Sequence, residues 1–66
     1  MFALEHQRTA GAYRAVQHFR SHKAAVAALA KIAAQTPERP YNGEDKWQDS
    51  NDTHNVNRYR ITEIKL

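Results

Sequence analysis

The sequence predicts an α+β fold in which two strands, one helix and a last strand form two layers. Three observations carry this prediction. Residues 22–35 repeat their apolar positions with helical spacing, residues 2–8 alternate apolar and polar side chains, and residues 12–19 and 57–66 have strand-like composition. The simplest closure of this β-β-α-β order is a small antiparallel or mixed sheet with the helix packed across one face.

The first two expected strands form a hairpin. In residues 2–8 the alternation turns Phe2 and Leu4 toward the core, and Thr9-Ala10-Gly11 is the expected turn, with Gly11 free to adopt positive φ. Residues 12–19 fit a strand in either phase. We favour the phase that turns Tyr13, Ala15 and Phe19 to the core. The opposite face then carries Arg14, Val16 and His18.

The expected helix begins after Ser21, whose hydroxyl can accept from a free backbone N–H of the first turn, and it ends at Thr36-Pro37. Its core-facing positions are Ala25, Val26, Leu29, Ile32 and Ala33, with Ala28 at the edge. The opposite side holds Lys23, Ala27, Ala30, Lys31 and Ala34. These alanines either serve helix propensity or form a smooth surface against which a partner or second subunit packs.

Residues 36–56 are expected to form a long acidic, polar loop, which in a compact domain tends to be functional or disordered. Asn42-Gly43 is a strong turn signal around which a short hairpin could form. In the last strand, 57–66, Tyr59 and Ile61 share one phase. Ile64 and Leu66 share the other, so a bulge near Thr62-Glu63 or a strand end covered on both faces is expected.

Length and composition predict one small domain over residues 1–66. There is no cysteine, and no apolar run approaches the roughly 20 residues that span a bilayer. The first ten residues already include Glu5, His6, Gln7 and Arg8, which does not fit a signal peptide. We therefore expect a cytoplasmic protein that does not enter a membrane.

The net charge of +3 is unevenly distributed along the chain. Residues 1–35 carry five Lys or Arg side chains against Glu5 alone, and residues 57–66 are also basic. Residues 36–56 reverse the balance, because five acidic side chains face only Arg39 and Lys46. The sequence thus predicts a basic body with one acidic segment.

Catalytic motifs are missing from the sequence. The two glycines lie far apart, and Ser21 and Ser50 have no nucleophile signature around them. His6, His18 and His22 could approach one another in the hairpin, but exposed or hydrogen-bonded histidines explain them more simply. We expect no enzyme activity, no cofactor, no metal site and no small-molecule substrate.

Two candidate binding surfaces remain. The first is the acidic loop, where a tryptophan lies among carboxylates as an aromatic anchor for a larger protein; its expected partner-binding residues are Tyr41, Asp45, Trp47, Asp49 and Asp52. In the competing interpretation, Trp47 caps the small core. The second surface is a basic sheet face, which is either an ordinary solvated face, a surface for a protein partner, or a surface that binds the phosphates of nucleic acid. Its residues are Arg8, Arg14, Arg58 and Arg60.

The outline of the chain resembles small bacteriophage-encoded accessory proteins. The resemblance lies in the hairpin, the aromatic two residues before a serine cap in Phe19-Arg20-Ser21, the alanine-rich helix and the terminal strand Arg58-Tyr59-Arg60-Ile61-Thr62-Glu63-Ile64. Such proteins often bind and inhibit a host machine such as RNA polymerase, a nuclease or a CRISPR complex. The resemblance therefore implies a non-enzymatic inhibitor of a larger assembly, and it assigns no role to any single residue.

Overall fold

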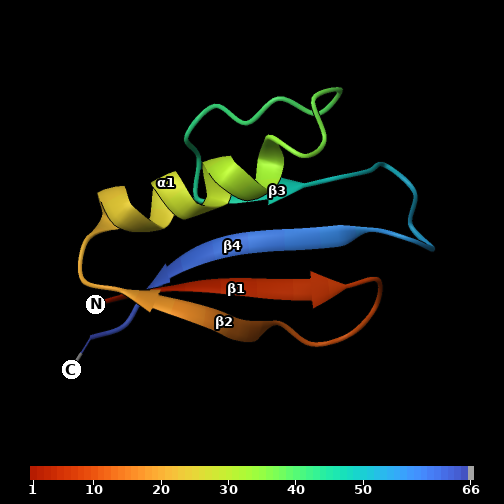
Figure 1. Cartoon of the computed structure of the whole chain (residues 1–66). Coiled ribbons are helices and arrows are strands. Elements are labelled where there is room, and N and C mark those ends of the chain that lie inside the picture. The colour runs from red at the N-terminus through yellow and green to blue at the C-terminus, as the bar shows by residue number, and fades with distance from the viewer. Residues whose placement is uncertain (66) are drawn as a thin grey trace.

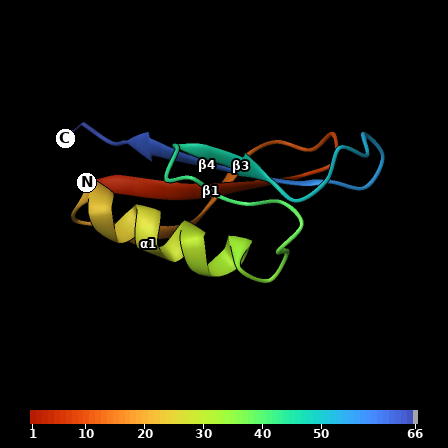
Figure 2. The same cartoon turned by 90° about the horizontal axis from the view of Figure 1, so that it is seen from above.

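A computed structural model describes residues 1–65 of the chain. In order, its elements are β1 (Phe2–Arg8), β2 (Arg14–Phe19), α1 (His22–Ala33), β3 (Lys46–Gln48) and β4 (Asn57–Glu63). The strands form one sheet in the order β2-β1-β4-β3, with every neighbouring pair antiparallel. The helix packs on one face (Figure 1 and Figure 2), so the predicted two-layer α+β fold is confirmed.

The core lies between α1 and the two central strands. Leu4 of β1 and Ile61 of β4 are register partners, and both pack against Ala25 and Leu29 of α1. Leu29 is 0% exposed. Every third or fourth residue of α1 therefore points at the sheet, as the sequence predicts.

The predicted start of the helix is confirmed, whereas its predicted end is two residues too late. The Ser21 hydroxyl accepts a hydrogen bond from the Ala24 N–H at 3.1 Å. The last α-helical residue is Ala33, after which the Gln35 and Thr36 N–H groups donate to carbonyls only three residues back. This tighter turn satisfies orphan carbonyls and brings the chain out of the helix before Pro37.

The predicted phase of β2 is wrong for its first half. Gln17 pairs with Leu4 and Ala15 pairs with Glu5, so Val16 is an extra residue, a β-bulge. The bulge shifts the alternation. Phe19 stays on the helix side as predicted, while Ala15 shares the helix-free face with Glu5, and Tyr13 lies there too, under the Arg60 guanidinium.

The hairpin turn between β1 and β2 uses a different residue from the one predicted. Thr9 adopts positive φ (56°), and Gly43 is the only described glycine that does so. Gly11 is instead a position of close approach, because a Cβ there would lie 3.3 Å from the Arg8 carbonyl oxygen. A larger residue at position 11 would crowd that oxygen.

The segment 36–56 is not one long loop. Lys46–Gln48 forms β3, an edge strand that pairs with β4 through Trp47 and Tyr59. Gly43 turns the chain with φ of 87°, but the strand after it pairs with β4, so the hairpin suggested around Asn42-Gly43 does not form. Long-range pairing, which local sequence does not encode, gives this segment its structure.

The last strand pairs with β1 without interruption up to Glu63 and then ends. The bulge expected near Thr62-Glu63 is therefore not present. Ile64 follows the strand, half-buried, and its N–H donates to the Met1 carbonyl at 2.8 Å. The predicted position of Leu66 lies outside the described residues.

α1 has 12 residues, and across residues 1–65 no helix has the length and apolar character needed to cross a bilayer.

Replacing Leu29 with Ala should lower the free energy of unfolding by about 2–5 kcal/mol, because the side chain is fully enclosed and leaves a cavity. Urea unfolding followed by circular dichroism measures this loss. Gln35→Ala, at an exposed position after the helix, should change stability by about 0.5 kcal/mol or less. Equal effects of the two changes would contradict the described core.

Candidate functional site

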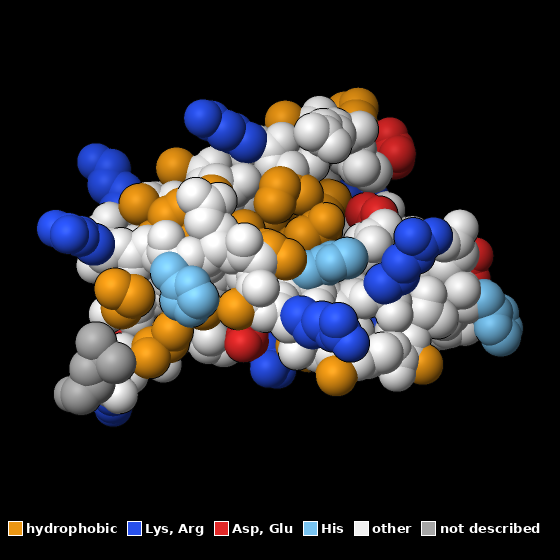
Figure 3. Space-filling model, turned by 60° about the horizontal axis from the view of Figure 1, so that its bottom comes forward, with side chains coloured by type: hydrophobic (Ala, Val, Ile, Leu, Met, Phe, Trp, Pro, Cys, Tyr) orange, Lys and Arg blue, Asp and Glu red, His pale blue; other side chains and the backbone are white. Residues whose placement is uncertain are grey.

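A hollow runs between the helix and the β2 edge of the sheet, and we call it the α1–β2 groove. It has a volume of about 530 Å³. The residues that line it are Leu4, Val16, Gln17, Phe19, Ala24, Ala27, Ala28, Lys31 and Ile32. Figure 3 looks onto this side of the molecule and shows hydrophobic side chains gathered at the surface, with Lys and Arg side chains around them.

The β-bulge explains why an apolar side chain is exposed in the groove. Bulges re-aim side chains and increase local twist. Val16, the bulged residue, is 56% exposed, which makes it one of only two large hydrophobic residues that are exposed in the described chain. The helix side of the groove adds small alanines, so the hollow is wide and its floor is apolar.

Cations predominate in the stretch of sequence that supplies the α1–β2 groove. From His6 to Pro37 the sequence contains no Asp or Glu, and it contains five Lys or Arg residues. Apart from Leu4, every residue that lines the groove comes from this stretch. Lys31 itself lies on the rim. The electrostatic potential there favours a negatively charged ligand.

The two aromatic residues predicted to contact a partner pack on the protein's own core. Trp47 and Tyr41 are half-buried against the cluster around Leu29. The Trp47 indole N–H donates to the Arg39 carbonyl at 2.9 Å, and its ring centroid lies 6.1 Å from that of Tyr59. The geometry thus matches the alternative in which Trp47 caps the core.

The predicted acidic residues also have partners within the chain. Asp45 contacts the His22 ring nitrogen Nε2 at 2.6 Å, which ties the start of β3 to the first turn of α1. The Asp49 carboxylate accepts from the backbone and side-chain N–H groups of Asn57, both at 2.9 Å. Asp52 accepts from the His54 N–H at 2.9 Å. These carboxylates organise the segment that carries them.

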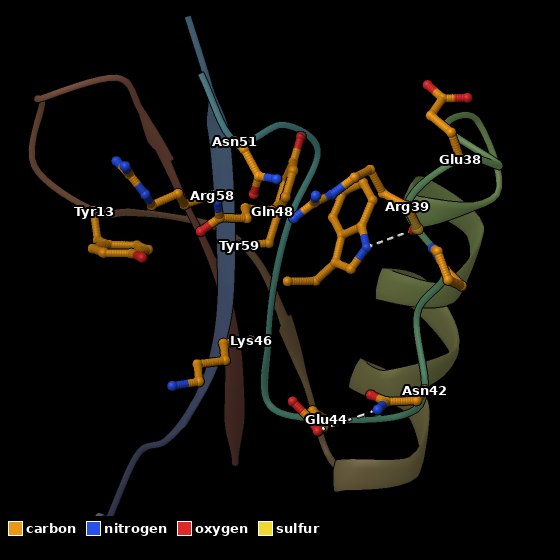
Figure 4. A pocket seen from close by; sticks show the side chains of 12 residues that line it. Tyr13, Glu38, Arg39, Asn42, Glu44, Lys46, Gln48, Asn51, Arg58 and Tyr59 are labelled. Carbon is orange, nitrogen blue, oxygen red and sulfur yellow. Dashed lines mark hydrogen bonds between the residues drawn. The ribbon is translucent and has the colours of Figure 1, made fainter. Parts of the chain in front are cut away.

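A second hollow of about 550 Å³ surrounds the free edge of β3. Figure 4 shows Tyr13 and Arg58 on one side of the strands and Arg39 on the other. Glu38 and Glu44 lie among the lining residues beside the cations, so the hollow has mixed charge. Burial, with the charges of Asp45 and Glu44, raises the pKa of the nearby Tyr41 phenol above its ordinary value. That phenol donates to the Glu44 carbonyl at 2.7 Å.

The four arginines predicted for nucleic acid do not share one sheet face. Arg58 and Arg60 are register partners of Gln7 and Glu5 on the helix-free face, whereas Arg14 pairs with His6 and Arg8 with Asn57 on the other. Arg60 donates to the Glu5 carboxylate at 2.6 Å and lies 3.9 Å over the Tyr13 ring. Arg58 donates to Thr9 O at 2.9 Å. Internal contacts therefore engage both arginines of the open face.

The three histidines considered as metal ligands are held apart by other contacts. His6 stacks on Tyr59 with 4.8 Å between ring centroids and hydrogen-bonds the Asn57 side-chain oxygen, while His22 contacts Asp45. His18 lies on the helix-free face as the partner of Ala3. Within residues 1–65, no group of three or more potential metal-ligating side chains comes together.

No protein-family model, curated protein or solved structure matches the chain. The functional argument therefore depends on the surfaces described above. The sequence indicates that Ala27 and Lys31 belong to a small-residue helix surface on which a partner could pack, but it does not predict that this surface and β2 form a groove. The bulge that exposes Val16 had no local sequence signal.

Trp47→Ala should lower the free energy of unfolding by about 3 kcal/mol, because it removes a large ring from the core edge. Trp47→Phe keeps most of the packing and loses only the hydrogen bond to the Arg39 carbonyl, so it should cost about 1 kcal/mol. Denaturant unfolding separates the two values. A Trp47→Ala protein as stable as the wild type would show that the ring does not support the core.

Stability should depend on pH through Asp49. Burial alone would raise its pKa, but the hydrogen bonds donated by the backbone and side chain of Asn57 lower the pKa below the ordinary value. A lowered folded-state pKa gives stabilisation that is present above the unfolded pKa of about 4 and lost as pH falls through the folded value. Asp49→Asn should therefore cost about 1 kcal/mol at pH 7. The difference from wild type should shrink as the pH falls below about 4 and through the lowered pKa of the folded state. A pH-independent difference would contradict this role.

Proposed function

We propose that the protein is a non-enzymatic binding protein whose α1–β2 groove receives a segment of a larger protein. The observation that carries this proposal is the groove itself: a hollow of about 530 Å³ with an apolar floor, open to solvent on a chain of 66 residues. Leaving apolar surface exposed costs stability and solubility, and contiguous exposed patches commonly mark interaction sites. Binding would bury that surface.

Inhibition of the bound partner follows from size and position. A segment held between α1 and β2 would be shielded by the body of the protein from its other ligands. No chemistry at the groove is needed for this effect, and its lining contains no hydroxyl, thiol or carboxylate group. The protein would thus inhibit a host assembly, as the resemblance to phage accessory proteins implies. It would contact that assembly through the groove rather than through the acidic segment.

Nucleic-acid binding is the second candidate, supported by the stretch of chain that lacks acidic residues. It has less support than protein binding. Arg58 and Arg60 already contact Thr9 and Glu5, and phosphate gains little from an apolar floor of Leu4, Val16 and alanines. If the protein binds nucleic acid, the affinity should fall steeply with salt concentration and should not change when groove residues are replaced.

A matched pair of helix variants tests the proposal. Ala27→Glu fills and charges the groove, whereas Ala30→Glu makes the same change at an exposed position of α1 outside it. Immobilised wild-type protein and Ala30→Glu should capture the same stoichiometric protein from bacterial lysate, and Ala27→Glu should lose it. Capture that is equal for all three, or the capture of nucleic acid alone, would refute the groove as the functional site.

A further inference from the structure

The sheet has more width than one helix can cover. Neighbouring strands lie about 4.8 Å apart, so four strands extend well beyond the roughly 10 Å diameter of a helix. In Figure 1 α1 is drawn above β4 and β1, and β2 forms the opposite edge of the sheet. The α1–β2 groove lies between α1 and this edge.

We propose that the α1–β2 groove is the position of a second helix, which the partner supplies as an acidic amphipathic segment. This inference rests on the proposed function and adds the structure and charge of what binds. The incoming helix would pack beside α1 and cover Val16 and the half-buried Phe19 of the sheet. It would complete the layer that α1 begins.

The flank of α1 is shaped for such a neighbour. Ala24, Ala27 and Ala28 are the helix residues nearest the groove, together with Lys31 and Ile32. Helix axes pack 8–10 Å apart, and small side chains allow the shorter distances. An apolar stripe with spacing i, i+3, i+4 and i+7 on the incoming helix would meet both the alanines and Val16.

Charge decides which helix fits. Lys31 lines the groove, Arg14 lies on the helix side of β2, and the chain from His6 to Pro37 contains no carboxylate. An acidic helix is attracted to this surface, and a basic one is repelled. A second copy of this chain is therefore a poor occupant, because its own α1 carries Lys23 and Lys31 without an acidic residue.

Strand addition at the β2 edge is the other geometric choice. β2 is exposed along almost its whole length, but the bulge at Val16 interrupts its regular ladder. Bulges on edge strands disfavour pairing with a further strand. A helix can bind without forming backbone hydrogen bonds to β2. It needs only an apolar surface and small side chains on α1, and the groove provides both.

A display library of random 16-residue peptides, panned on the wild-type protein alone, tests the inference when binding of each enriched peptide is then compared between wild type and Ala27→Glu. Enriched sequences should place apolar residues at i, i+3, i+4 and i+7 and be rich in Asp and Glu. A synthetic enriched peptide should gain helical circular dichroism on binding and shift the amide signals of Val16, Ala24 and Ala28. Its affinity should fall about tenfold for Lys31→Glu and less than about twofold for Lys23→Glu, a matched change outside the groove lining.

Several outcomes would overturn the inference, and they separate it from the proposed function. One such outcome is a set of peptides that bind wild type but not Ala27→Glu and yet have apolar residues at every second position, or lack acidic residues. These peptides would exclude the acidic helix, while the groove would still be a protein-binding site. Enrichment only of peptides indifferent to Ala27→Glu, or of none, would remove both. A dimer in sedimentation that Ala27→Glu dissociates would show that a second copy fills the groove, and would overturn the acidic partner helix.

Discussion

The area that one short helix can cover constrains every other part of this fold. α1 spans 12 residues and packs its apolar stripe on Leu4 and Ile61, the register partners at the sheet centre. Each outer strand must therefore be covered by something else or stay open. On the β3 side, the chain after the helix returns and lays Tyr41 and Trp47 on the core edge. On the β2 side nothing returns, and the groove remains.

The distribution of charge follows the same division. The acidic segment is held on the β3 side by contacts within the chain, through His22 to Asp45 and Asn57 to Asp49. Asp45 and Asp49 thus have partners within the chain, and none of the residues that line the groove carries a carboxylate. The β2 side keeps its cations with no acidic residue in the same stretch of sequence. The β3 side thus has mixed charge and carries Tyr41 and Trp47 on the core edge. The β2 side, by contrast, exposes Val16 beside a groove whose one charged lining residue is Lys31.

Local patterns were sufficient to predict the helix, its serine cap, its buried face with Leu29, and three of the strands. They failed where one residue changes the pairing. The bulge at Val16 reverses the phase of Ala15, and no nearby side chain signals it. β3 has only three residues, so its alternation is too short to identify, and its pairing with β4 gives it order. Whether Trp47 faces the core or a partner could not be predicted either, because it depends on the pairing of β3 with β4.

Methyl relaxation of the isolated protein by a soluble paramagnetic probe tests most directly whether the β2 side of the sheet is the open one. The account predicts strong broadening of the Val16, Ala27 and Ala28 methyl signals and little broadening of Leu29 and Val56, which are enclosed. The Trp47 ring protons should be attenuated to an intermediate degree. Val16 and Ala27 methyls as protected as Leu29 would contradict the account, because the groove would already be filled in the free protein.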